Sequence, residues 1–154
     1  MAVTKQRTKI VDAIKTRLNT LFGPSATLEK LFEEVRRCKL RPAPQRPMAT
    51  VLDDGQSRGG NDDDTSTERL LQVRIALHLF EDWEKAPANQ EWEDNVEKII
   101  FAMENYLPPY GCLSVKYQSD EPFDVLFLGG ASEAIWVINF EVKYEVETEE
   151  PDNR

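Results

Sequence analysis

The chain has 154 residues, of which 28 are acidic and 19 basic, so its formal charge is −9 at pH 7. This charge repels nucleic acid phosphates and anionic membranes, and DNA binding along the whole chain is not expected. With 40% hydrophobic residues, the chain fits one domain that needs no metal or disulfide to fold. Cys38 and Cys112 lack metal-ligand spacing, which favours free thiols. Because no segment resembles a membrane span or a signal peptide, we expect a protein made and kept inside a cell.

The first predicted element is an amphipathic helix that ends near Phe22, where Gly23-Pro24 forbids continuation. Its apolar residues recur at helical spacing, at Ile10, Ile14, Leu18 and Leu21. The segment Thr27–Val35 predicts a short helix that passes into extended chain, because apolar residues suit one or two turns at Leu28, Leu31, Phe32 and Val35. The prolines of Pro42–Pro47 then exclude both a helix and a central strand.

Two strands are predicted to form a hairpin with a long tip. Met48–Asp53 is a short strand, and the alternating residues of Leu71–Leu79 form a stronger one that returns antiparallel to it. Between them, Asp53–Glu68 contains three glycines, a run of acids and no apolar residue. We therefore expect a long exposed loop, of a kind that is often functional or disordered until bound.

A second helix begins at Asn89 or Gln90 and ends at Pro108-Pro109. Its apolar stripe comprises Trp92, Val96, Ile99, Ile100, Met103 and Leu107. Cys112–Tyr117 and Phe123–Leu128 then resemble strands, although the second could be a loop that covers the core.

The clearest pattern is the alternation of Ala134–Val146, which predicts a strand. Its second face changes from Ile135 and Val137 to polar residues, so we expect burial on both sides at the start and solvent on one side later. The tail Glu147–Arg154 is acidic and expected to fray. Residues 1–154 thus predict one α+β domain, a mostly antiparallel sheet of four to five strands with two main helices packed on one face.

No motif predicts catalysis, a metal or a cofactor. The acidic run at Asp62 lacks calcium-loop spacing, and the only histidine, His78, has no partner placed for a triad and is expected to be an ordinary surface or sheet residue. Glu81, Asp82 and Glu84 could pair for acid–base work but suit solvated carboxylates better. The paired glycines at 59–60 and 129–130 do not follow phosphate-binding patterns.

Basic residues gather between positions 36 and 46, against the acidic balance of the chain. They could contact phosphates or an acidic partner, or they could simply form a solvated face. Because no aromatic residues are interleaved with them, we prefer contact with a partner or a neighbouring subunit, whose acidic loop could be the contact. Our candidates for an assembly interface are Arg36, Arg37, Lys39, Arg41, Arg58, Asp62, Asp63 and Asp64.

The order of elements resembles the tail terminator and tail completion proteins of long-tailed bacteriophages, of the lambda minor tail protein U type. The resemblance covers residues 8 to 147 and rests on a basic stretch that ends in prolines, on PMATVLDD, LLQVRIALHLF, NQEWEDNVEKIIFAMENYL and AIWVINFEVKYEV, and on their order. Thr27–Arg41 and the acidic tail depart from the smallest members of the family.

The resemblance implies a homo-oligomeric ring, usually hexameric, which caps the tail tube at its head-proximal end, stops tube polymerisation and offers a docking surface to the neck or head completion protein. It implies no catalytic residue and no cofactor. DNA would pass through an acidic lumen without specific binding, because like charges repel. The alternatives are a neck or head–tail joining protein, and an acidic DNA-mimic module that inhibits a host enzyme.

Overall fold

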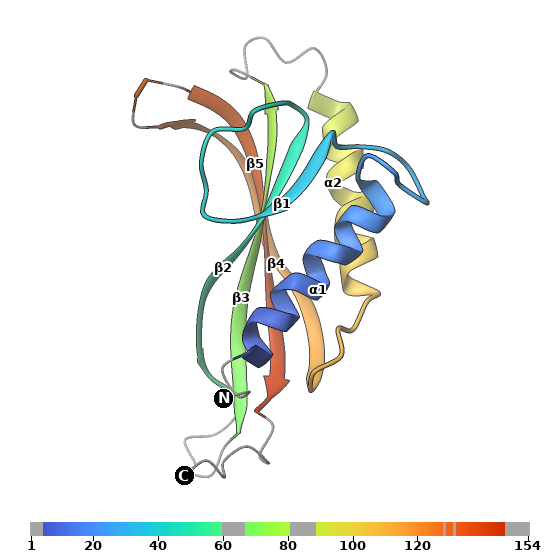
Figure 1. Ribbon diagram of the computed structural model, residues 1–154, viewed down its shortest axis with the longest axis vertical. Helices are drawn as coiled ribbons and strands as arrows, with labels where there is room; N and C mark the ends of the chain where they lie inside the picture. The colour runs from blue at the N-terminus through green and yellow to red at the C-terminus, as the bar shows by residue number, and fades with distance from the viewer. Residues whose placement is uncertain (1–4, 60–66, 81–88, 128, 131, 147–154) are drawn as a thin grey trace.

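One sheet of five strands, with both helices on one of its faces, makes up the fold (Figure 1). The structure is a computed structural model that describes residues 5–59, 67–80, 89–127, 129–130 and 132–146. Its elements are α1 (Lys5–Phe22), β1 (Glu34–Arg37), β2 (Met48–Arg58), β3 (Glu68–Phe80), α2 (Asn89–Glu104), β4 (Cys112–Leu126) and β5 (Ser132–Glu145). The strands lie in the order β1-β2-β3-β5-β4, and only β1 and β2 are parallel. The predicted α+β domain is confirmed.

α1 buries one stripe of apolar side chains and ends where the sequence predicts. Ile10, Ile14 and Leu18 are at most 3% exposed. The helix ends at Phe22 because Pro24 has no amide proton and disfavours a helical conformation of the residue before it. Only glycine fits at position 23, where a Cβ would come within 2.2 Å of the Asn19 side-chain oxygen.

Residues 23–33 form no helix, so the prediction of a short helix over Thr27–Val35 is wrong. The segment instead turns back over the end of α1, and the Phe32 amide donates to the Phe22 carbonyl at 3.0 Å. The last carbonyls of a helix have no partner within it, and this turn supplies one. The apparent helical stripe fails because Leu28 is 66% exposed, whereas Phe32 is buried.

The polar residues after Asp53 belong to a strand, so the prediction that a loop begins there is wrong. β2 continues to Arg58 and pairs antiparallel with β3, which confirms the hairpin itself. The register shifts beside Gly55, whose φ of +106° suits glycine better than other residues. Polar side chains suit this half of β2 because it is mostly exposed. Residues 60–66, which include Asp62, Asp63 and Asp64, lie outside the described ranges, as do Glu81, Asp82 and Glu84.

β4 is one continuous strand, which corrects the division into Cys112–Tyr117 and Phe123–Leu128 with a possible loop. It lies at the edge of the sheet and pairs with β5 alone among the strands described. An edge position tolerates Pro122, which has no amide proton to donate.

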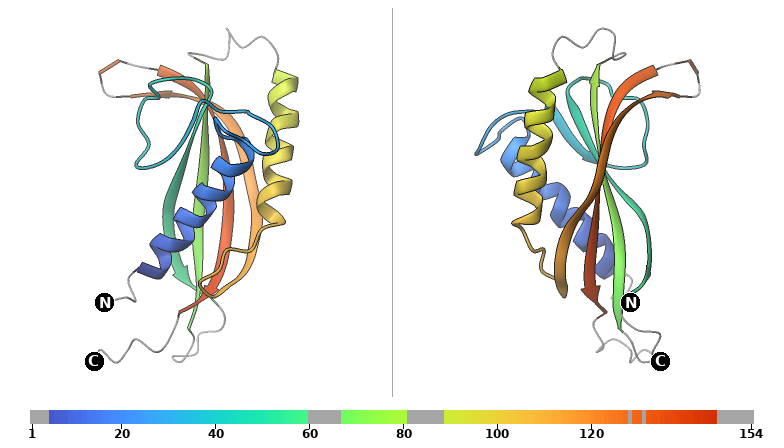
Figure 2. Two further views of the ribbon diagram at one scale, coloured as in Figure 1. Left: turned by 45° about the vertical axis from the view of Figure 1, so that its right-hand side comes forward. Right: turned by 180° about the vertical axis from the view of Figure 1, so that it is seen from behind.

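Both helices pack on the same face of the sheet (Figure 2). Their apolar side chains join one core with the inward positions of the strands, among them Ile75, Trp136 and Phe140. The stripe of α2 is confirmed from Trp92 to Met103, but the helix ends at Glu104 and Leu107 is 54% exposed.

The opposite face is covered only in part. Ala76, Ile135 and Val137 form a small second cluster there, and Leu40 from the connection between β1 and β2 packs against it. Further along β5, the polar positions from Asn139 to Lys143 are half-buried. The predicted change of β5, from burial on both sides to solvent on one, is confirmed.

Candidate functional site

Arg36 lies under the connection formed by residues 38–47 and ties it to the sheet. Its residue exposure is 9%, and its guanidinium donates to Thr50 Oγ1 at 2.9 Å and to the Arg41 carbonyl at 2.5 Å. The parallel register of β1 and β2 places Arg36 directly opposite Thr50. Arg36 is therefore internal, which corrects the expectation that it belongs to an assembly surface.

His78 and Glu133 are both fully buried and in contact. His78 Nδ1 lies 2.5 Å from Glu133 Oε1, and His78 Nε2 lies 2.8 Å from Thr50 Oγ1. Burial lowers the pKa of His78 by more than the hydrogen bond to Glu133 raises it, so the ring is neutral at pH 7. Because Thr50 Oγ1 accepts from Arg36, its own proton is directed to Nε2, and the network assigns the ring proton to Nδ1, which donates to Glu133.

Glu133 also holds the connection from its second oxygen. Oε2 accepts from the Ala43 amide at 2.6 Å and from Arg46 Nη2 at 3.0 Å. Arg46 brings the opposite charge, which a buried carboxylate requires. We call the set Arg36, Arg46, Thr50, His78 and Glu133 the buried polar cluster. It fixes residues 38–47 across the second face of the sheet.

The buried polar cluster contains residue types that perform acid–base catalysis, but a substrate has no access to them. Thr50, His78 and Glu133 are each 0% exposed, and their polar side-chain atoms already bond to one another or to the connection. The expectation of an ordinary surface or sheet histidine holds for the sheet but not for the surface. Glu133 carries no sequence signal, because it is one of 28 acids and belongs to no motif.

The remaining assembly candidates do not form one cluster. Arg37 faces the helices, where its Nε lies 3.0 Å from Asp12 Oδ1. Lys39 and Arg41 are exposed on the connection, and Arg58 is exposed at the far end of β2. A strand rises about 3.3 Å per residue, so Arg58 lies roughly 30 Å from the start of β2.

Both edges of the sheet are open over long stretches within the described part of the chain. β4 forms one edge along its whole length. At the other edge, β1 covers β2 only as far as Val51, so Leu52–Arg58 has no strand on that side. β4 also presents Leu113 and Leu126, which are 47% and 75% exposed. Open strand edges are places where another chain can add its own backbone.

A second basic region lies on α1. The helix contains five basic residues and one acid, at Lys5, Arg7, Lys9, Asp12, Lys15 and Arg17. The sequence prediction missed this region, although its local excess of positive charge is a signal that could have identified it.

Arg7 anchors α1 to β2 through a bidentate ion pair with Asp53. Both hydrogen bonds, from Nε and from Nη2, measure 2.5 Å. Partial burial alone would raise the pKa of Asp53, but the hydrogen bonds from Arg7 and from the Gly55 amide outweigh it and hold that pKa below its ordinary value. The ion pair therefore fixes the end of α1 from which the rest of its basic face extends.

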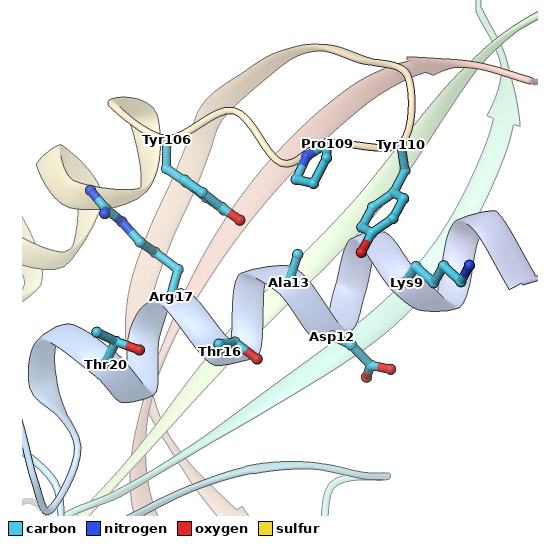
Figure 3. Close-up of a pocket in the computed structure, with 9 residues that line it drawn as sticks. All are labelled: Lys9, Asp12, Ala13, Thr16, Arg17, Thr20, Tyr106, Pro109 and Tyr110. Carbon is cyan, nitrogen blue, oxygen red and sulfur yellow. The ribbon is translucent and has the colours of Figure 1, made fainter.

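The outer side of α1 borders a groove of about 570 Å³, shown in Figure 3. One wall is the helix and the other is the segment after α2, whose two tyrosines reach toward the helix on either side of Pro109. Lys9 Nζ lies 5.7 Å from the centre of the Tyr110 ring, and the Arg17 guanidinium carbon lies 5.1 Å from that of Tyr106. Both distances fit cation–π pairs, which hold the cations at the rim of the groove.

Comparison of the sequence with models of known protein families finds no match, and comparison with curated proteins finds none either. Within the ranges that the structure describes, no three His, Cys, Asp or Glu side chains are grouped so that they could hold a metal ion. Neither described helix combines the length and the apolar character that crossing a membrane requires.

Proposed function

We propose that this protein is a structural component of a bacteriophage virion, a tail terminator whose copies form a ring, of six subunits by the family resemblance. The ring caps the head-proximal end of the tail tube, stops its polymerisation and presents the surface on which the neck or head completion protein docks. It assembles in the host cytoplasm and stays in the tail.

The observation that carries this proposal is the pair of open edges on one sheet. A subunit of a closed ring needs two different surfaces, one for each neighbour. β4 offers a long edge with exposed leucines, and the Leu52–Arg58 stretch of β2 offers a polar edge on the opposite side of the sheet. A single compact subunit thus has two unlike edges at which neighbours could bind.

The chemistry of the buried polar cluster agrees with a structural role. The two members that could transfer protons, His78 and Glu133, bond to each other, and Glu133 also holds the connection 38–47. The charge of −9 also suits a passage for DNA, because an acidic lumen lets the duplex move without binding it.

The test is assembly with and without a tail tube. Native mass spectrometry and negative-stain electron microscopy at increasing protein concentration should reveal a closed ring, alone or after purified tail tubes are added. Tubes capped by the protein should stop growing at that end. A protein that stays monomeric at every concentration and neither binds nor caps tubes would contradict the proposal.

Two other outcomes would replace it. A ring that ignores tubes but binds an isolated neck or portal complex would identify a head–tail joining protein. A monomer that competes with DNA for a nuclease or polymerase would identify a DNA mimic.

A further inference from the structure

The groove between α1 and residues 106–110 has the chemistry of a site for an extended acidic peptide. Its floor is mostly apolar, with Ala13 and Pro109 in the lining, and Lys9 and Arg17 stand along its length. Arg17 Nε is buried and donates no hydrogen bond within the described residues. The acid in the lining, Asp12, already lies against Arg37. The two cations are therefore available for carboxylates.

The end of β5 lies beside one end of this groove. The Gln6 side-chain amide donates both to the Tyr110 carbonyl, at 2.6 Å, and to the Glu145 carbonyl, at 2.7 Å. The Glu145 amide in turn donates to the Gly111 carbonyl at 3.0 Å. The Val146 amide donates to the Thr67 carbonyl at 2.8 Å, so the described chain ends one residue beyond the contacts of Glu145 with Gln6 and Gly111.

The segment that follows, residues 147–154, matches the groove in charge and in reach. Its sequence is ETEEPDNR. The acids of this segment are Glu147, Glu149, Glu150 and Asp152. Lys9 and Arg17 are eight helical residues apart, which is about 12 Å. An extended chain rises about 3.3 Å per residue, so the eight residues of the segment can span up to about 26 Å, which is longer than the distance between the two cations.

We propose that residues 147–154 dock along this groove of their own subunit, with their carboxylates on Lys9 and Arg17. The segment would cover the basic face of α1. This inference does not depend on the proposed ring.

Paramagnetic relaxation in the full-length protein tests the proposal. The probe is a nitroxide on Asn153→Cys in a Cys38→Ser background, and Cys38→Ser without the new cysteine gives the reference spectrum. The amide signals of Ala13, Thr16 and Tyr106 should lose most of their intensity. The loss should be independent of protein concentration and should diminish in 0.5 M salt, which shortens the range of charge interactions.

A charge variant supplies the specificity control. Lys9→Gln with Arg17→Gln should restore the broadened signals, whereas Lys39→Gln with Lys116→Gln removes the same charge from exposed sites elsewhere and should leave them broadened. Unchanged core signals establish that each variant is folded. If the groove variant does not fold, the salt response of the labelled parent protein still tests whether docking depends on charge.

Three results would overturn the proposal: signals at the groove that stay sharp, broadening that survives both salt and the Lys9 and Arg17 changes, or broadening that appears only between a labelled and an unlabelled copy. The last would mean that the segment docks on another subunit. None of these outcomes bears on whether the protein caps a tail tube, so the two proposals can fail separately.

Discussion

Glu133 is the residue whose environment departs most from what its sequence context suggests. It is fully buried, yet its two oxygens bind His78, the Ala43 amide and Arg46. A buried charge is tolerated only when its partners are in place. Removing the carboxylate of Glu133 therefore leaves several buried polar groups without their acceptor.

We therefore predict that Glu133→Ala lowers the free energy of unfolding by about 3 to 5 kcal/mol, the range for breaking a buried ion pair. Chemical denaturation monitored by tryptophan fluorescence measures it. The matched control is Glu141→Ala on the same strand, a half-buried acid with one bond to Gln72 at 3.3 Å, which should cost less than about 1 kcal/mol. Equal losses would show that the carboxylate of Glu133 is not held as described.

His78 should make stability depend on pH. Its pKa is lowered in the folded protein by burial, and Arg36 and Arg46 act in the same direction against the hydrogen bond and charge of Glu133. The unfolded chain then binds a proton more readily than the folded one. The free energy of unfolding should thus fall as pH drops below the ordinary histidine pKa of about 6.5, until the lower folded pKa is reached.

This is the only histidine in the chain, so His78→Gln provides a clean comparison. The variant should be less stable at pH 8 but should lose the decline that begins near pH 6.5, as measured by urea denaturation between pH 8 and pH 5. A decline of the same slope in the variant would assign it to carboxyl groups instead.

At the scale of elements, hydrophobic periodicity correctly predicts a helix or a strand wherever one face of the element is buried and the other is not. α1, α2 and β5 were predicted for this reason, and β3 as well. The failures have a different physical origin. The apolar residues of Thr27–Val35 have helical spacing but belong to a turn that caps α1, and the polar half of β2 is a strand because its partner β3 imposes the pairing.

The candidate site was harder to predict than the fold. The arginines between 36 and 46 are close in sequence and suggest one surface. Because side chains alternate along a strand, Arg36 and Arg37 lie on opposite faces of the sheet. Glu133 meets His78 only because β5 lies beside β3, a pairing that joins residues 55 positions apart. Such contacts leave no local pattern in a single sequence.

Replacing a buried side chain of β5 by alanine should destabilise the protein far more than the same change in the acidic run between β2 and β3. Trp136 is 7% exposed, and its indole donates to Asp120 at 2.8 Å. Trp136→Ala should cost about 3 to 5 kcal/mol, the range for a buried aromatic residue. Replacing Asp62, Asp63 and Asp64 by alanine together should leave the thermal midpoint nearly unchanged. Comparable shifts in differential scanning calorimetry would contradict the prediction from the sequence that these acids lie in an exposed loop.

At the scale of the whole molecule, the two faces of the sheet are covered by other elements to different extents, and its edges are left largely uncovered. The helices cover one face, the connection 38–47 covers part of the other, and the described edges remain open. Assembly through β4 should then depend on the exposed leucines of that strand, which contribute little to the core of the subunit.

We predict that Leu113→Glu with Leu126→Glu abolishes formation of the proposed ring while the thermal midpoint changes little, because both side chains are already exposed. Analytical ultracentrifugation measures assembly, and calorimetry measures folding. Leu28→Glu is the matched control, since Leu28 is 66% exposed but belongs to the turn after α1 and not to β4. A double variant that still forms rings would remove β4 from the interface.

The paired hydrogen bonds of Gln6 have a consequence for how the chain could be rearranged. They bring the beginning of α1 and the end of β5 to one corner of the molecule, at the lower ends of both elements in Figure 1. Neighbouring termini are the condition under which circular permutation preserves a fold. A short linker from Val146 to Gln6, with new ends opened between β2 and β3, should yield a permuted chain with the same sheet.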